Sequence, residues 1–189
     1  MKRVAVLISG RGSNLQALLG AARDAYEIAL VVSNNPDAEG LVRARDAGVE
    51  AIALDHRPYG KDREAFERDL DALLIQRNID LVALAGFMRV LTPFFVRAWA
   101  NRLVNIHPSL LPKYPGVKTH ERALEAGDTE HGCTVHLVVE EVDAGEILGQ
   151  AKLAIRQGDT PATLAERVLE LEHSLYPRCL AELARAARR

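Results

Sequence analysis

The sequence has few cysteines, few aromatic residues and no long apolar run, and each shortage excludes a class of protein. The two cysteines, Cys133 and Cys179, cannot make a disulfide framework, and neither belongs to a closely spaced metal-binding pair. Aromatic residues make up only 5% and the formal net charge is −2, whereas proteins that bind nucleic acids usually carry a basic excess and stacking side chains. No segment approaches the roughly 18 apolar residues of a membrane helix. We therefore expect a cytoplasmic protein that binds neither nucleic acid nor a membrane.

What the sequence does contain is typical of a globular domain. Hydrophobic residues account for 48% and charged residues for 26% of 189 positions, close to the globular average. No Ser/Gly/Pro-rich linker divides the chain, so we predict one domain over residues 1–189. The apolar run 4–8 follows two basic residues but is shorter than the roughly 7–15 residues of a secretory signal's apolar region.

Short apolar runs alternate with amphipathic stretches over the first hundred residues. The runs predict buried strands at Val4–Ile8, Ile28–Val32, Ala51–Leu54, Leu81–Ala85 and Leu103–Ile106. The stretches between them predict helices at Asn14–Arg23, Ala38–Ala47, Arg63–Arg77 and Pro93–Trp99, the last with a capping Thr92 hydroxyl. Strands joined by helical crossovers form a parallel sheet, so the fold class is α/β, doubly wound and mostly parallel.

The pattern changes after Ile106. Residues 107–116 read as a proline-punctuated loop. Thr134–Val139 and Ile147–Ile155 are predicted strands whose short separation leaves no room for a crossover helix, so they should form an antiparallel hairpin. Thr160 and Pro161 predict the start of a long closing helix through Ala184, followed by a basic end at Arg185, Arg188 and Arg189.

A glycine-rich segment, Ser9-Gly10-Arg11-Gly12-Ser13-Asn14, joins the first predicted strand to the first helix. Glycines let the backbone approach an anion, and the free N–H groups of a helix start favour negative charge. A dinucleotide-binding turn would need a third glycine where Leu15 stands, and an acidic residue after the second strand. The segment therefore favours a single phosphate, and the alternative is a tight turn in which Ser13 only caps the helix.

Asn105 and His107 lie two apart at the end of the fifth predicted strand, so their side chains share a face. Ligands bind at this edge of an open α/β sheet. Histidine can transfer a proton near neutral pH, and asparagine can donate to a developing oxyanion. From these residues alone, a polar strand end hydrogen-bonded to a loop is equally well supported.

Asp143 stands before Ala144 and Gly145 between two predicted strands, where an aspartate usually forms a turn. Only proximity to His107 would give it a catalytic role. The remaining histidines show no zinc-type spacing, and His136 alternates with apolar neighbours as a hydrogen-bonded strand residue would. No metal is expected.

Together these segments resemble the glycinamide ribonucleotide formyltransferases, folate-dependent enzymes of purine biosynthesis. The resemblance covers essentially the whole chain and is carried by five segments: 9–14, Leu84-Ala85-Gly86-Phe87-Met88-Arg89, Asn105-Ile106-His107-Pro108-Ser109-Leu110-Leu111-Pro112, His131-Gly132 and Val142-Asp143-Ala144-Gly145. It implies the formyltransferase fold, small-molecule substrates, 10-formyltetrahydrofolate as co-substrate, no metal, and a monomer or homodimer.

The resemblance also assigns residues. Asn105, His107 and Asp143 would be catalytic, with Asp143 favouring the protonated imidazole because a nearby negative charge stabilises a cation. The substrate phosphate and ribose would be bound by Gly12, Ser13, Asn14 and Glu172. The folate would be bound by Arg63, Met88, Arg89, Val90, Leu91, Asn105, Val139, Glu140, Glu141, Val142 and Asp143.

Three alternatives predict different behaviour. A methionyl-tRNA formyltransferase and a formyltetrahydrofolate hydrolase share the fold but need further domains, for which we expect 189 residues to leave no room. A non-catalytic nucleotide-binding module would explain the glycine-rich segment but would leave Asn105 and His107 without a role.

Overall fold

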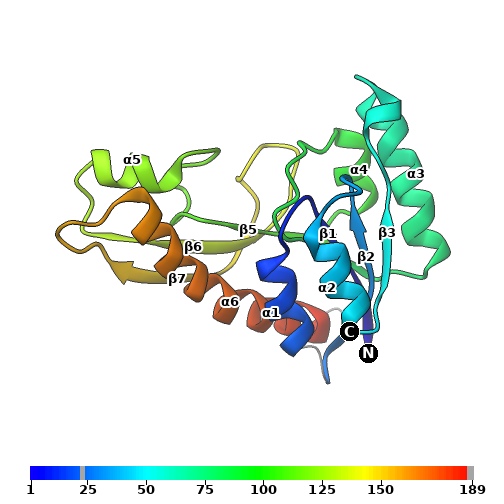
Figure 1. The fold of residues 1–189 in the computed structure, drawn as a ribbon, viewed down its shortest axis with the longest axis horizontal. Helices are drawn as coiled ribbons and strands as arrows, with labels where there is room; N and C mark the ends of the chain where they lie inside the picture. Colours follow the sequence, from blue (N-terminus) through cyan, green and yellow to red (C-terminus); the bar gives the residue numbers. More distant parts are fainter. Residues whose placement is uncertain (22–23, 187–189) are drawn as a thin grey trace.

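A seven-stranded sheet of order β3-β2-β1-β4-β5-β6-β7 forms the centre of the structure (Figure 1). The structure is a computed structural model that describes residues 1–21 and 24–186. The strands are β1 (Lys2–Ile8), β2 (Tyr26–Ser33), β3 (Glu50–Ala53), β4 (Leu81–Leu84), β5 (Leu103–His107), β6 (Glu130–Leu137) and β7 (Ile147–Ala154). The first five pair in parallel, whereas β6 is antiparallel to both β5 and β7. The predicted α/β, mostly parallel sheet and its added hairpin are therefore confirmed.

Helices cover both faces of this sheet. They are α1 (Ser13–Ala21), α2 (Glu39–Asp46), α3 (Arg63–Gln76), α4 (Pro93–Ala98), α5 (Thr119–Glu125) and α6 (Pro161–Ala186), with a short 3-10 helix η1 (Arg57–Tyr59). Strand β1 sends Val4, Val6 and Ile8 into a core shared with α1, α2 and α6. Its alternate residues Ala5 and Leu7 pack in a second core with α3 and α4. Burial on both faces explains why β1 and β4 read as continuous apolar runs. Strand β3, at the edge of the sheet, is half-buried or exposed, so its prediction as a buried strand is wrong.

One predicted strand boundary needs correction, one helix was not predicted, and one predicted helix terminus lies outside the described residues. The strand predicted from Thr134 to Val139 begins at Glu130 and ends at Leu137, which leaves Val138 and Val139 in a loop. Helix α5 was not predicted, because it has only seven residues and buries little more than Thr119 and Ala123. Helix α1 ends at Ala21, and the predicted terminus Arg23 lies outside the described residues, as do Arg188 and Arg189.

The two predicted Thr-Pro helix starts behave differently. At α6, the Thr160 hydroxyl accepts from the Thr163 N–H at 3.2 Å, which is ordinary N-capping. At α4, Pro93 occupies the first turn as predicted, but the Thr92 side chain makes no capping hydrogen bond. Its hydroxyl donates instead to the Glu67 carboxylate on α3. The capping role expected of Thr92 is therefore wrong.

The glycine-rich segment is held by close backbone packing. Gly12 has a φ of +73°, and a Cβ there would lie 3.0 Å from the Gly40 Cα at the start of α2. The Gly40 N–H donates to the Gly10 carbonyl at 3.0 Å. A larger side chain at Gly12 or Gly40 would separate the segment from α2. This contact fixes the turn that leads into α1.

Two further features complete the fold. The Leu111–Pro112 peptide bond, in the loop after β5, is cis. Within residues 1–21 and 24–186, no helix is long and apolar enough to cross a membrane.

Candidate active site

The candidate site lies at the carboxyl edge of the sheet, where β1, β4 and β5 end side by side. Two cavities open there. The larger, of about 480 Å³, reaches from Asn14 and Glu172 to His107. The smaller, of about 160 Å³, lies against Asp143 and the loops around it. Asn105 and Phe87 line both cavities, so these two residues mark the place where the cavities meet.

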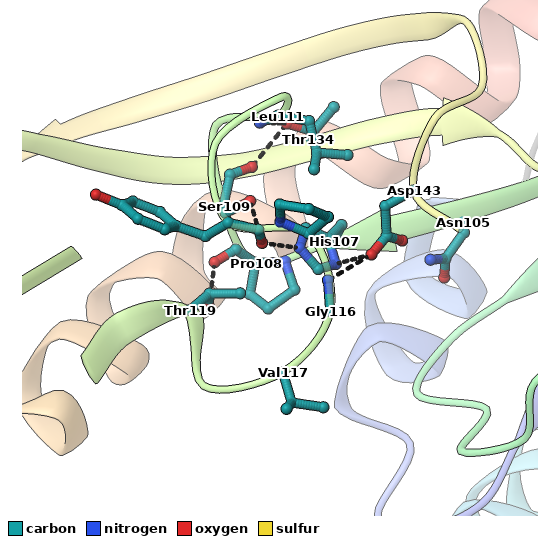
Figure 2. Close-up of polar contacts among 12 residues, drawn as sticks. Asn105, His107, Pro108, Ser109, Leu111, Gly116, Val117, Thr119, Thr134 and Asp143 are labelled. Carbon is teal, nitrogen blue, oxygen red and sulfur yellow. Dashed lines mark hydrogen bonds and ion pairs between the residues drawn. The ribbon is translucent and has the colours of Figure 1, made fainter. Parts of the chain in front are cut away.

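Asn105, His107 and Asp143 come together at this boundary (Figure 2). The Nδ1 atom of His107 lies 3.6 Å from Asp143 Oδ2, and its Nε2 lies 2.8 Å from the Tyr114 carbonyl oxygen. Because a carbonyl only accepts, Nε2 carries a hydrogen in either charge state. Nδ1 is therefore the atom that gains or loses a proton, and it faces the Asp143 carboxylate.

Asp143 is not simply a turn former. It has a φ of 54°, which aspartate adopts more readily than most residues, and the Gly116 N–H donates to its Oδ2 at 2.8 Å. The loop after β5 and the loop after β6 therefore meet at this carboxylate. The proximity to His107 that a catalytic role requires is present.

His136 is the buried, hydrogen-bonded strand residue that the sequence predicts, and it also lines the smaller cavity. It is paired with Asn105 across β5 and β6, and its Nε2 lies 3.7 Å from Asp143 Oδ1. Its Nδ1 is 2.9 Å from the Leu137 carbonyl oxygen. Burial lowers the pKa of His136, so its neutral form is favoured beside Asp143. The alternation in the sequence correctly indicated its burial but could not show the residues opposite.

Asn14 and Glu172 form the far end of the larger cavity. Asn14 Nδ2 donates to Glu172 Oε2 at 2.8 Å, although the two residues lie 158 positions apart. Asn14 Oδ1 is buried and has no hydrogen-bond partner among the described residues. Burial raises the pKa of Glu172, and the hydrogen bond from Asn14 partly opposes that shift. An unpaired buried acceptor is costly, so this end suits a ligand with hydroxyl donors.

Ser13 does not line the larger cavity. It borders a neighbouring hollow of about 380 Å³, together with Arg43 and His173. His173 Nε2 is buried and, within the described residues, lacks a hydrogen-bond partner. Asn14 and Glu172 line the larger cavity, and their chain neighbours Ser13 and His173 border the hollow. The hollow therefore lies next to the larger cavity. Arg43 and His173 were missed in the sequence, where neither belongs to a motif.

The segments expected to bind folate line the smaller cavity. Its lining includes Arg89, Val90, Leu91, Val139, Glu140, Val142 and Asp143. Met88 lines the larger cavity instead, with 79% of its surface exposed. Arg63 lies beside the smaller cavity, where its Nη1 donates to the Val90 carbonyl at 3.4 Å, whereas Glu141 is exposed at the loop tip.

Part of the larger cavity comes from the unpredicted helix α5. Lys118, Thr119 and His120 line its wall, and His120 Nδ1 lies 3.0 Å from His131 Nε2. Burial lowers the pKa of His131 to about 4, so this imidazole pair is uncharged at neutral pH. Across residues 1–21 and 24–186, no cluster of three or more histidine, cysteine, aspartate or glutamate side chains could hold a metal ion.

Comparison with known proteins identifies the class. Residues 2–180 match the formyl transferase family. The chain therefore belongs to the formyl transferase family.

Within that class, the chain is similar to proteins named phosphoribosylglycinamide formyltransferase and to a trifunctional purine biosynthetic protein. It is 48% identical over 177 residues to phosphoribosylglycinamide formyltransferase of Escherichia coli strain K12, covering 92% of this chain and 83% of that protein. It is 50% identical over 187 residues to the trifunctional purine biosynthetic protein adenosine-3 of Drosophila melanogaster. That match covers 96% of this chain but only 14% of the Drosophila protein. The phosphoribosylglycinamide formyltransferase structure from Coxiella burnetii superposes with a TM-score of 0.92 at 47% identity, covering 98% of this chain and 88% of that one.

Proposed function

We propose that the protein transfers the formyl group of 10-formyltetrahydrofolate to the amine of 5-phosphoribosylglycinamide. The products are N-formylglycinamide ribonucleotide and tetrahydrofolate, in purine biosynthesis. The observation that carries this proposal is the meeting of two cavities at Asn105, with His107 lining one and Asp143 the other. A transferase with two substrates needs this arrangement, because the reacting atoms must approach within about 3–3.5 Å.

The larger cavity would hold the ribonucleotide. The N–H groups of Gly12, Ser13 and Asn14 begin α1 and would bind the phosphate, with Arg43 and His173 beside them in the adjoining hollow. Asn14 Oδ1 and the Glu172 carboxylate would then accept from the ribose hydroxyls. Both acceptors lie between the phosphate end and the catalytic residues, which is where the sugar must lie.

The smaller cavity would hold the reduced folate. Arg89, Val90 and Leu91 would contact one side of the ligand and residues 139–143 the other, with Met88 at the edge of the ligand, where it lines the larger cavity. Val90 and Val142 are more than half exposed, which suits contact with a flat, partly apolar ring system. Arg63 and Arg89 lie toward the outside, where they would attract the folate carboxylates.

At Asn105 the amine would attack the formyl carbon and form a tetrahedral oxyanion. The Asn105 amide and the protonated Nδ1 of His107 would donate to that oxygen. His107 would then give its proton to the departing folate nitrogen and recover one from the attacking amine, so charge and protons balance. Asp143 would favour the charged imidazole throughout, and no step requires a metal or a covalent enzyme intermediate.

We further propose that residues 1–189 act as one formyltransferase domain in the cytoplasm, as a monomer or homodimer, without nucleic-acid or membrane partners. Because the chain spans 14% of the trifunctional Drosophila protein, only this single activity is proposed.

The experiment compares glycinamide ribonucleotide with its unphosphorylated riboside as the acceptor. Charge-assisted hydrogen bonds contribute about 1.5–3 kcal/mol each, so loss of the phosphate should lower kcat/KM by at least about a hundredfold. Ser13→Ala and Asn14→Ala should weaken the ribonucleotide while leaving the KM for folate nearly unchanged. Equal use of both acceptors would contradict the phosphate site. Rapid formyl loss to water with neither acceptor present would indicate a hydrolase, and nucleotide binding without folate turnover would indicate a non-catalytic module.

A further inference from the structure

Glu67 is a buried carboxylate whose hydrogen-bond partners, within the described residues, both belong to Thr92, the residue that follows the segment proposed to bind folate. It lies in the middle of α3 with 2% of its surface exposed. Its Oε1 accepts from the Thr92 N–H at 2.8 Å, and its Oε2 accepts from the Thr92 hydroxyl. A buried glutamate is rare unless it is paired, because it loses its hydration.

The start of α4 does not by itself require this carboxylate. A threonine hydroxyl can cap a helix from its own side chain, as Thr160 does at α6. At Thr92 the hydroxyl and the backbone N–H both turn toward α3 instead. Glu67 therefore fixes the position of Thr92 relative to α3, which a side-chain cap alone would not do.

That position sets one end of the Met88–Leu91 segment, which belongs to no helix or strand. The other end is held where the Met88 N–H donates to Ser9 Oγ at 2.8 Å. Between them, Arg63 donates to the Val90 carbonyl from one turn earlier on α3. The segment is therefore held by side chains of other elements near both ends and at Val90. Of these contacts, the one at Thr92 is made by the buried carboxylate of Glu67.

We infer that Glu67 is a positioning residue for folate binding. Its carboxylate fixes Thr92 and so holds the Met88–Leu91 segment in the shape that the reduced folate requires. The inference rests on the proposed function, which assigns this segment to the folate. It predicts a loss mainly for folate, because Asn14 and Glu172 lie on other elements and because Met88, which lines the larger cavity, is held by Ser9 at the other end of the segment. A binding residue keeps its geometry only when neighbouring residues fix its position.

The test measures KM for 10-formyltetrahydrofolate and for glycinamide ribonucleotide in matched variants. Glu67→Ala leaves both Thr92 donors without their acceptor, so the KM for folate should rise about tenfold to a hundredfold. The KM for the ribonucleotide should stay within about twofold. Glu67→Gln should recover much of the loss, because its amide oxygen can accept from the Thr92 N–H while its amide nitrogen donates to the hydroxyl.

Two partner variants keep the test decisive if Glu67→Ala fails to fold. Thr92→Val removes the hydroxyl at nearly constant shape and should raise the KM for folate several-fold, whereas Thr92→Ser should not. Glu64→Gln is the matched control, since Glu64 lies on the same helix, is exposed, and pairs with Arg68. It should leave both KM values unchanged.

The outcomes separate the two proposals. A parallel rise in both KM values, or an unchanged KM for folate in Glu67→Ala and Thr92→Val, would overturn the positioning role while formyl transfer by the wild type stands. A wild-type protein that transfers no formyl group would overturn the proposed function itself.

Discussion

The two cavities on either side of Asn105 are built in different ways. The far end of the larger cavity rests on regular structure, because Asn14 and Glu172 project from α1 and α6 and bond to each other. The smaller cavity is formed largely by two loops, 85–92 after β4 and 138–146 after β6. Three of its valines, Val90, Val139 and Val142, are exposed, and its loops are fixed by contacts from Glu67, Gly116 and Ser9. Side chains on helices are positioned by the fold, whereas loop residues need support from their neighbours.

Asp143→Asn should have a larger effect than substitutions at Glu172 or Val142. It should slow the chemical step without weakening the binding of either substrate. The amide keeps an oxygen for the Gly116 N–H, so the loop stays in place. Without the charge beside His107 Nδ1, kcat should fall by about a hundredfold or more, with both KM values nearly constant. Steady-state kinetics with each substrate varied would show this.

Glu146→Gln, at the far end of the same loop, is the control and should retain normal kcat. A near-normal kcat in Asp143→Asn would return Asp143 to the role of a turn residue.

Glu172→Gln should affect only the larger cavity. Loss of the charged acceptor should raise the KM for the ribonucleotide by about tenfold. Burial raises the pKa of Glu172, so the folded state holds that proton to higher pH than the unfolded chain. The resulting stability is complete below the ordinary glutamate pKa and is lost as pH rises through the raised value.

A neutral glutamine escapes that loss, so the free energy of unfolding of Glu172→Gln relative to wild type should increase from pH 4 to pH 8. Urea titrations at both pH values measure the difference, with the exposed Glu166→Gln as the control. If Glu172→Gln gains no stability over wild type at pH 8, then the ionised Glu172 does not destabilise the folded state.

Val142→Ser should have a smaller effect, on the smaller cavity alone. Val142 is 58% exposed, so a bound folate can cover it further. Replacing its methyl groups with a hydroxyl should raise the KM for folate about three- to fivefold. Val42 on α2 is 54% exposed and lines neither cavity, so Val42→Ser is a matched control. Equal effects of the two substitutions would argue against folate contact at Val142.

The sequence predicted what depends on local pattern. Continuous apolar runs identified the five parallel strands, most clearly β1 and β4, whose residues are largely buried. The spacing of Asn105 and His107 correctly indicated a shared face, because alternation along a strand is a local property. Thr160 and Pro161 likewise marked the start of α6.

The contacts that span the chain were beyond local pattern. No residue near Thr92 in the sequence indicates that its hydroxyl donates to Glu67, 25 positions away, instead of capping the helix that follows. The role of His136 depends on pairing between β5 and β6, and that of His173 on the approach of α6 to α1. Helix α5 was missed because its few buried residues give no periodic signal.

The most direct measurement is single-turnover transfer by Asn105→Ala, together with the dissociation constants of both substrates. Asn105 lies where the cavities meet, so its amide should act on the oxyanion rather than on either ground state. We predict a rate at saturation lower by about 10²–10³-fold, with both dissociation constants within about threefold of wild type and an unchanged melting temperature. A variant that transfers the formyl group at the normal rate, whether or not it is destabilised, would contradict the account.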